Sequence, residues 1–284
     1  MTISRGTIYQ GFKYAVYIFL AMNVYWFFAE EFLAAKVQFP NGLPTGDIIE
    51  AYAATIDTFA WVILLLMFEL ETYVLEDRHF TRGVSWTLQG VRIVCYGFIV
   101  YAFYGYIVNV DFLHTVVPST SITDLCALPA GEWSYAIDLD EYELITAANC
   151  QSFSSAGAFL EFPGIAAVVD ATGLSALLGL AWIDVINAGV WLLVVLVLEI
   201  DVRLQEHNRY EGLALHASNV IKVFLYGTLL YAAIYWGIKG DFVDFWDAFL
   251  WLVAFVFIEL NVFEWRQESL EQESLEEAAQ PGGS

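Results

Sequence analysis

Three apolar stretches of the chain carry the same polar residues at the same spacing. Each copy begins with Asp or Asn and has a Trp four residues later and a Glu eight residues after that. It ends two positions further on with Glu, Asp or Asn. The copies are Asp57, Trp61, Glu69, Glu71; Asn187, Trp191, Glu199, Asp201; and Asp247, Trp251, Glu259, Asn261. Ionisable groups inside apolar segments are costly and often mark ion or proton pathways. The pattern therefore predicts a repeated carboxylate set that coordinates a cation or relays protons.

Basic residues recur in the apolar stretches that precede the copies. Lys13, Arg92 and Lys222 are each followed by a tyrosine four residues later. We expect them to act as counter-charges, in an ion pathway or in intramembrane ion pairs, for Glu69, Glu199 and Glu259. Two other interpretations stay open: the pairs only lock neighbouring helices together, or the charges reach to a nearby membrane surface.

The first, second and last positions of each copy fall on one stripe of a helix, at 100° per residue. We interpret the three tryptophans on these stripes as packing or interface residues. Asp241, Asp244 and Asp247 follow at three-residue spacing and share a helix face. They either complement the dipole of a helix N-terminus or form an electronegative mouth that concentrates cations.

The elements that position these residues follow from composition. The chain of 284 residues is 59% hydrophobic and 15% charged, and its formal net charge is -22. Such hydrophobicity argues against a disordered or soluble protein. The excess of acids argues against nucleic-acid binding. The fold class predicted is an all-α integral membrane protein.

Six stretches are apolar enough to span a bilayer. They run over Phe12–Phe28, Tyr52–Val74, Val84–Val110, Leu174–Val202, Val220–Ile238 and Phe242–Phe263. Together with the repeat they predict a six-helix transmembrane bundle built from three two-helix hairpins. Basic residues gather on one side, leaving Lys36 and Lys239 on the other. We therefore expect both termini to be cytoplasmic, in a bacterial inner (plasma) membrane.

The predicted organisation has four parts. Residues 1–110 hold the first three helices, 111–172 an extracytoplasmic loop insertion, 173–266 the last three helices, and 267–284 an acidic cytoplasmic tail. The insertion is rich in Ser, Thr, Asp and Pro, and we read it as a polar cap rather than a separate domain. Cys126 and Cys150 in an exported loop predict a disulfide bond, with two free thiols as the alternative.

No metalloprotease, P-loop or nucleophile-elbow motif occurs in the sequence, so an enzyme is disfavoured, and we expect no cofactor and no metal site. The first functional hypothesis is a cation or proton channel or transporter that uses the intramembrane carboxylates. The second is a non-catalytic accessory or scaffold subunit of a membrane complex. The expected partners are the lipid bilayer and a membrane protein or a second copy of the chain.

Overall fold

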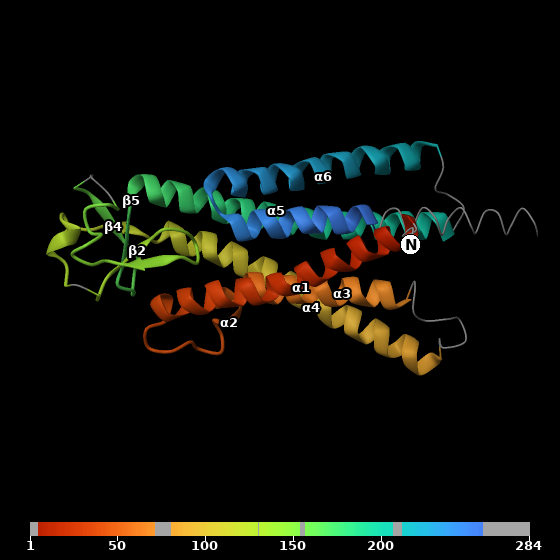
Figure 1. Ribbon diagram of the computed structural model, residues 1–284, viewed down its shortest axis with the longest axis horizontal. Helices are drawn as coiled ribbons and strands as arrows, with labels where there is room; N and C mark the ends of the chain where they lie inside the picture. Colours follow the sequence, from red (N-terminus) through yellow and green to blue (C-terminus); the bar gives the residue numbers. More distant parts are fainter. Residues whose placement is uncertain (1–4, 72–80, 130, 154–156, 207–211, 258–284) are drawn as a thin grey trace, which may run out of the picture.

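Helices make up most of the chain in the computed structural model, which describes residues 5–71, 81–129, 131–153, 157–206 and 212–257. The long helices are α1 (Arg5–Gln38), α3 (Ala53–Glu69), α4 (Arg82–His114), α5 (Ala171–Glu206) and α6 (Leu213–Lys239), and residues 242–257 are also helical. They run along the long axis of the molecule, with a small sheet at one end (Figure 1). We call that end the sheet end, and the end where α1 begins and α5 ends the far end.

Four of these helices are long and apolar enough to cross a membrane. They cover Tyr9–Gln38, Arg82–His114, Ala171–Asp201 and Leu213–Lys239. Each of the six predicted spans overlaps a helix, although α3 is only 17 residues long. Many large apolar side chains on these helices are exposed, as expected for surfaces that face lipid rather than water. The structure thus agrees with the prediction of a membrane protein.

The helices pack around a common apolar core that runs through the bundle. Leu20 of α1, Leu65 of α3, Val194 of α5 and Leu229 of α6 are all almost fully buried in it. Each helix also presents its opposite face outward, which matches the low share of buried residues in each apolar span. A bundle of this kind buries side chains inward while every backbone hydrogen bond is satisfied within a helix.

The short helix α2 (Ile48–Ala51) was not expected from the sequence. It packs against α4 at Gly105, where an added Cβ would lie 2.9 Å from the backbone oxygen of Ile49. Glycine therefore allows the two backbones to come this close. Glu31 of α1 accepts hydrogen bonds from the backbone nitrogens of Ala54 and Thr55, at 2.8 and 3.0 Å. It satisfies the N-terminus of α3, so α1, α2 and α3 are joined at the sheet end.

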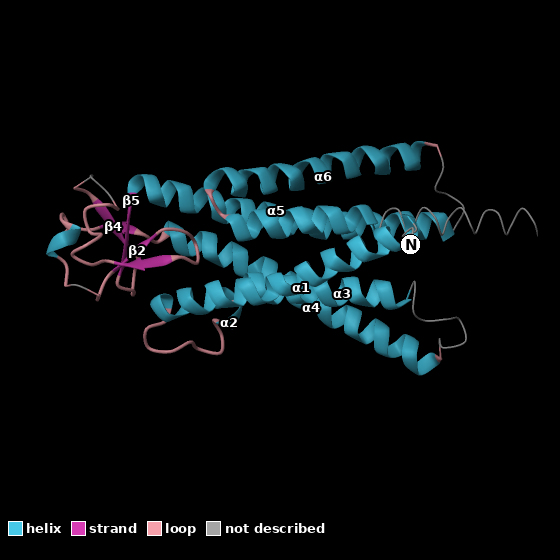
Figure 2. Ribbon diagram, in the orientation of Figure 1, coloured by secondary structure: helices cyan, strands magenta, loops and turns pink. Residues whose placement is uncertain are grey.

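A five-stranded sheet fills the segment between α4 and α5 (Figure 2). Its strand order is β1-β4-β5-β2-β3, with β2 and β5 parallel and the other neighbours antiparallel. The strands are β1 (Val117–Pro118), β2 (Ser134–Ala136), β3 (Tyr142–Leu144), β4 (Phe159–Glu161) and β5 (Ala167–Asp170), with a 3-10 turn η3 (Leu125–Ala127) after β1. The prediction of an all-α chain is therefore wrong for this segment.

The sheet has a hydrophobic core of its own, which the prediction of a polar cap missed. Val168 and Val169 of β5 are fully buried, and Phe159 of β4 packs with them. Each strand is only two to four residues long, which is too short for an alternating pattern to stand out among Ser, Thr and Asp. The core continues onto Leu113 of α4 and Leu177 of α5, so the sheet is seated on the ends of two helices.

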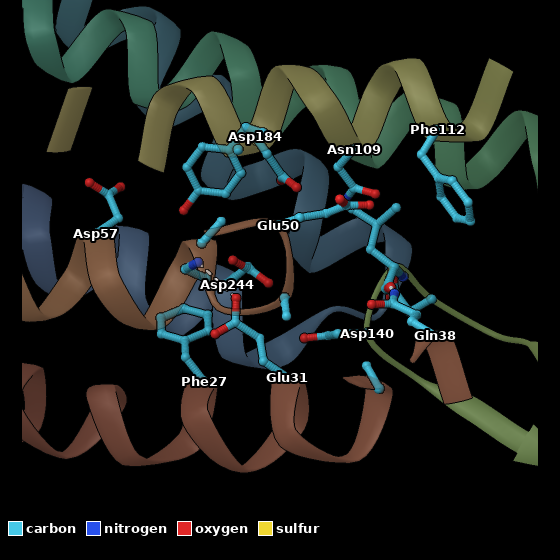
Figure 3. A pocket seen from close by; sticks show the side chains of 18 of the residues that line it. Phe27, Glu31, Gln38, Glu50, Asp57, Asn109, Phe112, Asp140, Asp184 and Asp244 are labelled. Atoms are coloured by element: carbon cyan, nitrogen blue, oxygen red, sulfur yellow. Dashed lines mark hydrogen bonds between the residues drawn. The ribbon is translucent and has the colours of Figure 1, made fainter. Parts of the chain in front are cut away.

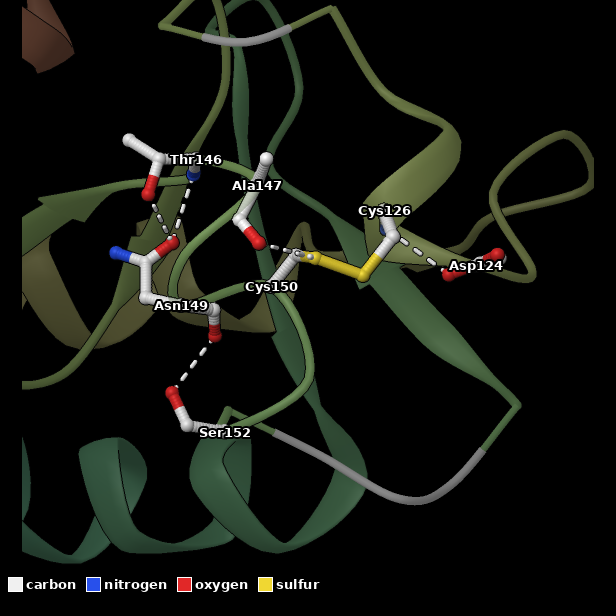
Figure 4. Close-up of a disulfide and its surroundings, with 7 residues drawn as sticks. All are labelled: Asp124, Cys126, Thr146, Ala147, Asn149, Cys150 and Ser152. Carbon is white, nitrogen blue, oxygen red and sulfur yellow. Dashed lines mark hydrogen bonds between the residues drawn. A yellow bond between two sulfur atoms is a disulfide. The ribbon is translucent and has the colours of Figure 1, made fainter.

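A disulfide joins Cys126 and Cys150 in the structure, with their Cα atoms 5.1 Å apart (Figure 4). The turn after β3 that carries Cys150 is held by Asn149, whose Oδ1 accepts hydrogen bonds from the backbone nitrogen and the hydroxyl of Thr146. Asp124 accepts a hydrogen bond from the backbone nitrogen of Cys126 at 2.9 Å. The bridge therefore links two locally ordered turns of the sheet region.

Candidate functional site

A cavity of about 350 Å³ lies between the helices at the sheet end. Its walls come from α1, α2, α3, α4, α5, α6, residues 241–248 and the loops at residues 138–140 and 163–165. Nine carboxylic acids line it: Glu31, Glu50, Asp57, Asp138, Asp140, Asp184, Asp241, Asp244 and Asp247. No Lys or Arg is among the described residues that line this cavity. We call it the acidic cavity.

The acids are spread along the cavity instead of gathering at one point. Asp57 lies at one end of it and Asp140 at the other, with Asp184 and Asp244 between them (Figure 3). Asp241, Asp244 and Asp247 follow the same axis, because each step of three residues advances an α-helix by about 4.5 Å. Within the described residues, no group of three or more His, Cys, Asp or Glu side chains is placed to hold a metal ion.

The roof of the cavity is the turn between β2 and β3. Gln38, at the end of α1, donates hydrogen bonds to the backbone oxygen of Leu139 at 3.5 Å and to the Tyr142 hydroxyl at 3.1 Å. This holds the turn over the helices. Burial, together with the Asp241 carboxylate, raises the pKa of Asp138 to about 6. Burial also raises the pKa of Asp140 well above its usual range, so the roof carboxyls resist carrying charge together.

The floor of the cavity is formed by the first position of each repeat copy. Asp57, Asn187 and Asp247 all line it, and Asn23 of α1 donates a hydrogen bond to Asp247 at 2.8 Å. The Oδ1 atoms of Asp57 and Asn187 are buried without a hydrogen-bond partner. Buried polar atoms are nearly always hydrogen-bonded, so two such atoms at one cavity floor indicate that it accommodates a polar ligand or water.

The three repeat tryptophans meet directly below this floor. The ring centroids of Trp61, Trp191 and Trp251 lie 6.3, 6.3 and 6.4 Å apart, and all three side chains are at least nine-tenths buried. We call them the tryptophan triad. Edge and tilted packing at these distances is favourable for aromatic rings. The triad and the aliphatic residues beyond it close the bundle between the acidic cavity and the far end.

Ion pairs occupy the far end. Lys13 lies 2.6 Å from Glu69, with side chains 2% and 8% exposed, and the Tyr14 hydroxyl donates a second hydrogen bond to Glu69. Arg92 donates to both oxygens of Glu71, at 3.0 and 2.8 Å. Lys222 lies 2.8 Å from Asp201, which also accepts a hydrogen bond from Ser218. Arg203 pairs with Glu199 on the surface, where both side chains are more than half exposed.

This arrangement differs in part from the pairing expected from the sequence. Lys13 contacts Glu69; both were among the charges expected to pair, although the sequence did not assign them to each other. Arg92 and Lys222 instead contact Glu71 and Asp201, the last positions of the first and second copies. These positions come two residues after Glu69 and Glu199, and residues two apart on a helix point about 200° away from each other. Glu199 therefore faces away from Lys222 and pairs with Arg203. The third copy ends in Glu259 and Asn261, which lie outside the described residues.

Several cavity residues were not singled out from the sequence as candidate site residues. Glu31, Glu50 and Asp184 line the cavity but belong to no repeat copy. A single acid deep inside an apolar span, as at Asp184, was the available signal. No sequence signal pointed to Gln38, because its role depends on the β2–β3 turn that it holds by hydrogen bonds.

No known protein family model, curated protein or solved structure matches this chain. The functional conclusion therefore depends on the geometry of the site alone.

Proposed function

We propose that the chain is a polytopic membrane protein that takes up cations in the acidic cavity and conducts or transports them across the bilayer. In this proposal six helices span the membrane as three repeated hairpins, in a bacterial inner (plasma) membrane. The sheet lies on the extracytoplasmic side, where its disulfide is stable, and both termini are cytoplasmic. The cavity then opens on the extracytoplasmic half of the protein.

The observation that carries the proposal is the uncompensated charge of the cavity. Nine carboxylic acids line it, and its described lining contains no basic side chain. Asp57 and Asp247 stand on apolar helices below the roof, where a bare carboxylate is expensive unless a cation or proton neutralises it. Rings of Asp and Glu are the usual device by which pores favour cations.

The far-end acids have a structural role in this proposal. Glu69 is already neutralised by Lys13, and Glu71 and Asp201 by Arg92 and Lys222. We assign these pairs to holding the helices in register, and assign cation binding to the acidic cavity. Passage of a cation then requires the tryptophan triad to separate.

Flux in proteoliposomes tests this assignment. Uptake of a monovalent cation should fall about tenfold or more in Asp57→Asn and Asp247→Asn, because each removes one charge from the floor of the cavity. Asp111→Asn is the matched control, since Asp111 lies exposed on α4 outside the cavity lining. Equal uptake by the wild type and both floor variants would remove the proposal, as would absence of uptake by the wild type.

The packing below the floor favours a second candidate, a non-conducting accessory or scaffold subunit. The triad and the buried residues Leu65, Val194 and Leu250 form an apolar layer between the acidic cavity and the far-end ion pairs. In this alternative the acidic cavity only binds a cationic group of a partner. Recovery of a stoichiometric membrane partner after gentle extraction, together with absence of flux, would establish it over the first candidate.

A further inference from the structure

The acidic cavity has the shape and lining of a site for an elongated organic cation. Its acids lie at successive levels along its length: of those labelled in Figure 3, Asp57 is at one end, Glu31, Asp184 and Asp244 are in the middle, and Asp140 is toward the other end. The three aspartates at 241, 244 and 247 set the spacing of these levels at about 4.5 Å along the helix axis. Negative charge is therefore distributed along a line.

A bare metal ion does not match this distribution. Ca²⁺ and Mg²⁺ require about six to eight oxygen ligands converging on one centre. The described residues contain no group of three or more carboxylate, His or Cys side chains placed for such a centre. The volume of about 350 Å³ is instead in the range of pockets that hold small organic molecules.

Aromatic rings line the same cavity as the acids. Trp236, which is 3% exposed, and Trp191 line the cavity together with Phe27, Tyr106 and Phe112. Faces of such rings attract ammonium groups and also cover aliphatic carbon. This combination of carboxylates and aromatic rings suits a molecule in which ammonium groups alternate with short aliphatic spacers.

Unpartnered polar atoms provide the second observation. Asp57 and Asn187 each hold a buried Oδ1 that lacks a hydrogen-bond donor. An ammonium group at the floor supplies N–H donors to the two oxygens. No basic side chain of the described lining competes for these oxygens.

We propose that the acidic cavity is a binding site for linear aliphatic polyamines, whose ammonium groups lie at the levels of its carboxylates. This inference rests on the proposed function and specifies its ligand class. The cation enters with its chain along the cavity axis, one end against Asp57 and Asn187 and the other under the β2–β3 turn.

Titration calorimetry of the full chain in detergent tests the inference, with spermidine, putrescine and Mg²⁺ as probes at equal ionic strength. We expect spermidine to bind at least about tenfold more tightly than Mg²⁺, and putrescine to fall between them, because its two ammonium groups engage fewer levels. Asp244→Asn should weaken spermidine about tenfold while Mg²⁺ changes less. Asp111→Asn should leave both unchanged.

Two further variants separate a binding role from a folding defect. Trp236→Phe keeps a ring and should retain most of the spermidine affinity, whereas Trp236→Leu should lose about tenfold with an unchanged elution profile. Equal affinity of spermidine and Mg²⁺, or an Asp244→Asn effect equal for both, overturns the polyamine inference. If monovalent cation flux still depends on Asp57 in that case, the proposed function stands alone. If none of the cations binds and no flux occurs, both fail.

Discussion

The two halves of the bundle treat buried charge in opposite ways. At the far end, Glu69, Glu71 and Asp201 each contact a basic side chain at 2.6 to 2.8 Å. At the sheet end, nine acids share one cavity whose described lining contains no Lys or Arg. Paired charges satisfy each other within the protein and fix geometry. Unpaired charges of one sign require protons or cations from outside. We therefore assign a stabilising role to the far-end acids and ligand binding to the sheet-end acids.

The largest expected effect tests whether the far-end pairs are structural. Lys13→Met should destabilise the protein by about 3–5 kcal/mol, because it leaves the Glu69 carboxylate buried without its partner. The double variant Lys13→Met/Glu69→Leu should recover most of that loss. Chemical unfolding in mild detergent measures both. A double variant as unstable as the single one would mean that the pair itself, and not the unpaired charge, determines the stability.

The next effect concerns the sheet that roofs the cavity. Cys126→Ser should cost the sheet region about 3 kcal/mol, because the bridge closes a loop with a sequence separation of 24 residues. Limited proteolysis should then cut within residues 116–170 while the helices stay protected. Cys95→Ser, at the free cysteine of α4, is the control and should leave the sheet protected. Equal cleavage of the two variants would show that the bridge does not stabilise the roof.

Protonation of the roof gives a smaller effect of opposite sign to ordinary acid denaturation. The pKa of Asp138 is about 6 in the folded protein, and about 3.9 is usual for an unfolded chain. The folded state therefore binds more protons between these values, and the sheet region should lose about 1–2 kcal/mol as the pH rises from 4 to 7. Asp138→Asn should reduce this slope, as followed by pH-dependent unfolding, and Asp140, whose pKa burial also raises, should account for part of the remainder. A wild-type slope that persists in the variant would assign it to other groups.

The smallest effect is expected on the surface of the far end. Glu199→Gln should change stability by less than about 0.5 kcal/mol, because its pair with Arg203 is solvent-exposed. Cation flux should also stay at the wild-type level if conduction depends on the sheet-end acids. A strong loss of flux in this variant would return the pathway to the carboxylates first singled out from the repeat.

Sequence patterns were informative where a residue repeats within a long apolar segment. The spacing of Trp61, Trp191 and Trp251 identified side chains that meet in the structure, although their contact depends on how the three helices converge. The helical segments were also visible, because apolar stretches of this length form helices in a bilayer. Lys13 and Glu69, which are 56 positions apart, were both singled out as charges, but no sequence pattern assigned them to each other.

The rest depends on tertiary structure that periodicity does not encode. The strands of the sheet are too short to give an alternating pattern in the sequence, and their pairing includes the parallel contact of β2 with β5. The choice between Glu69 and Glu71 as the partner of Arg92 is decided by helix rotation. The acidic cavity joins Glu31, Asp140 and Asp184 from three separate regions of the chain, so no local pattern could have assembled it.

The tryptophan triad has an electrical consequence. From Trp61 to Glu69 the helix rises by about 12 Å, and this layer is the apolar insulator of the protein. In the proposed orientation the acidic cavity extends the external solution down to this layer, so the membrane voltage drops mainly across it. A cation that crosses the triad then traverses most of the field, which is worth about 2.3 kcal/mol per charge at 100 mV. The three indoles therefore lie in the layer of the protein across which most of the membrane voltage falls.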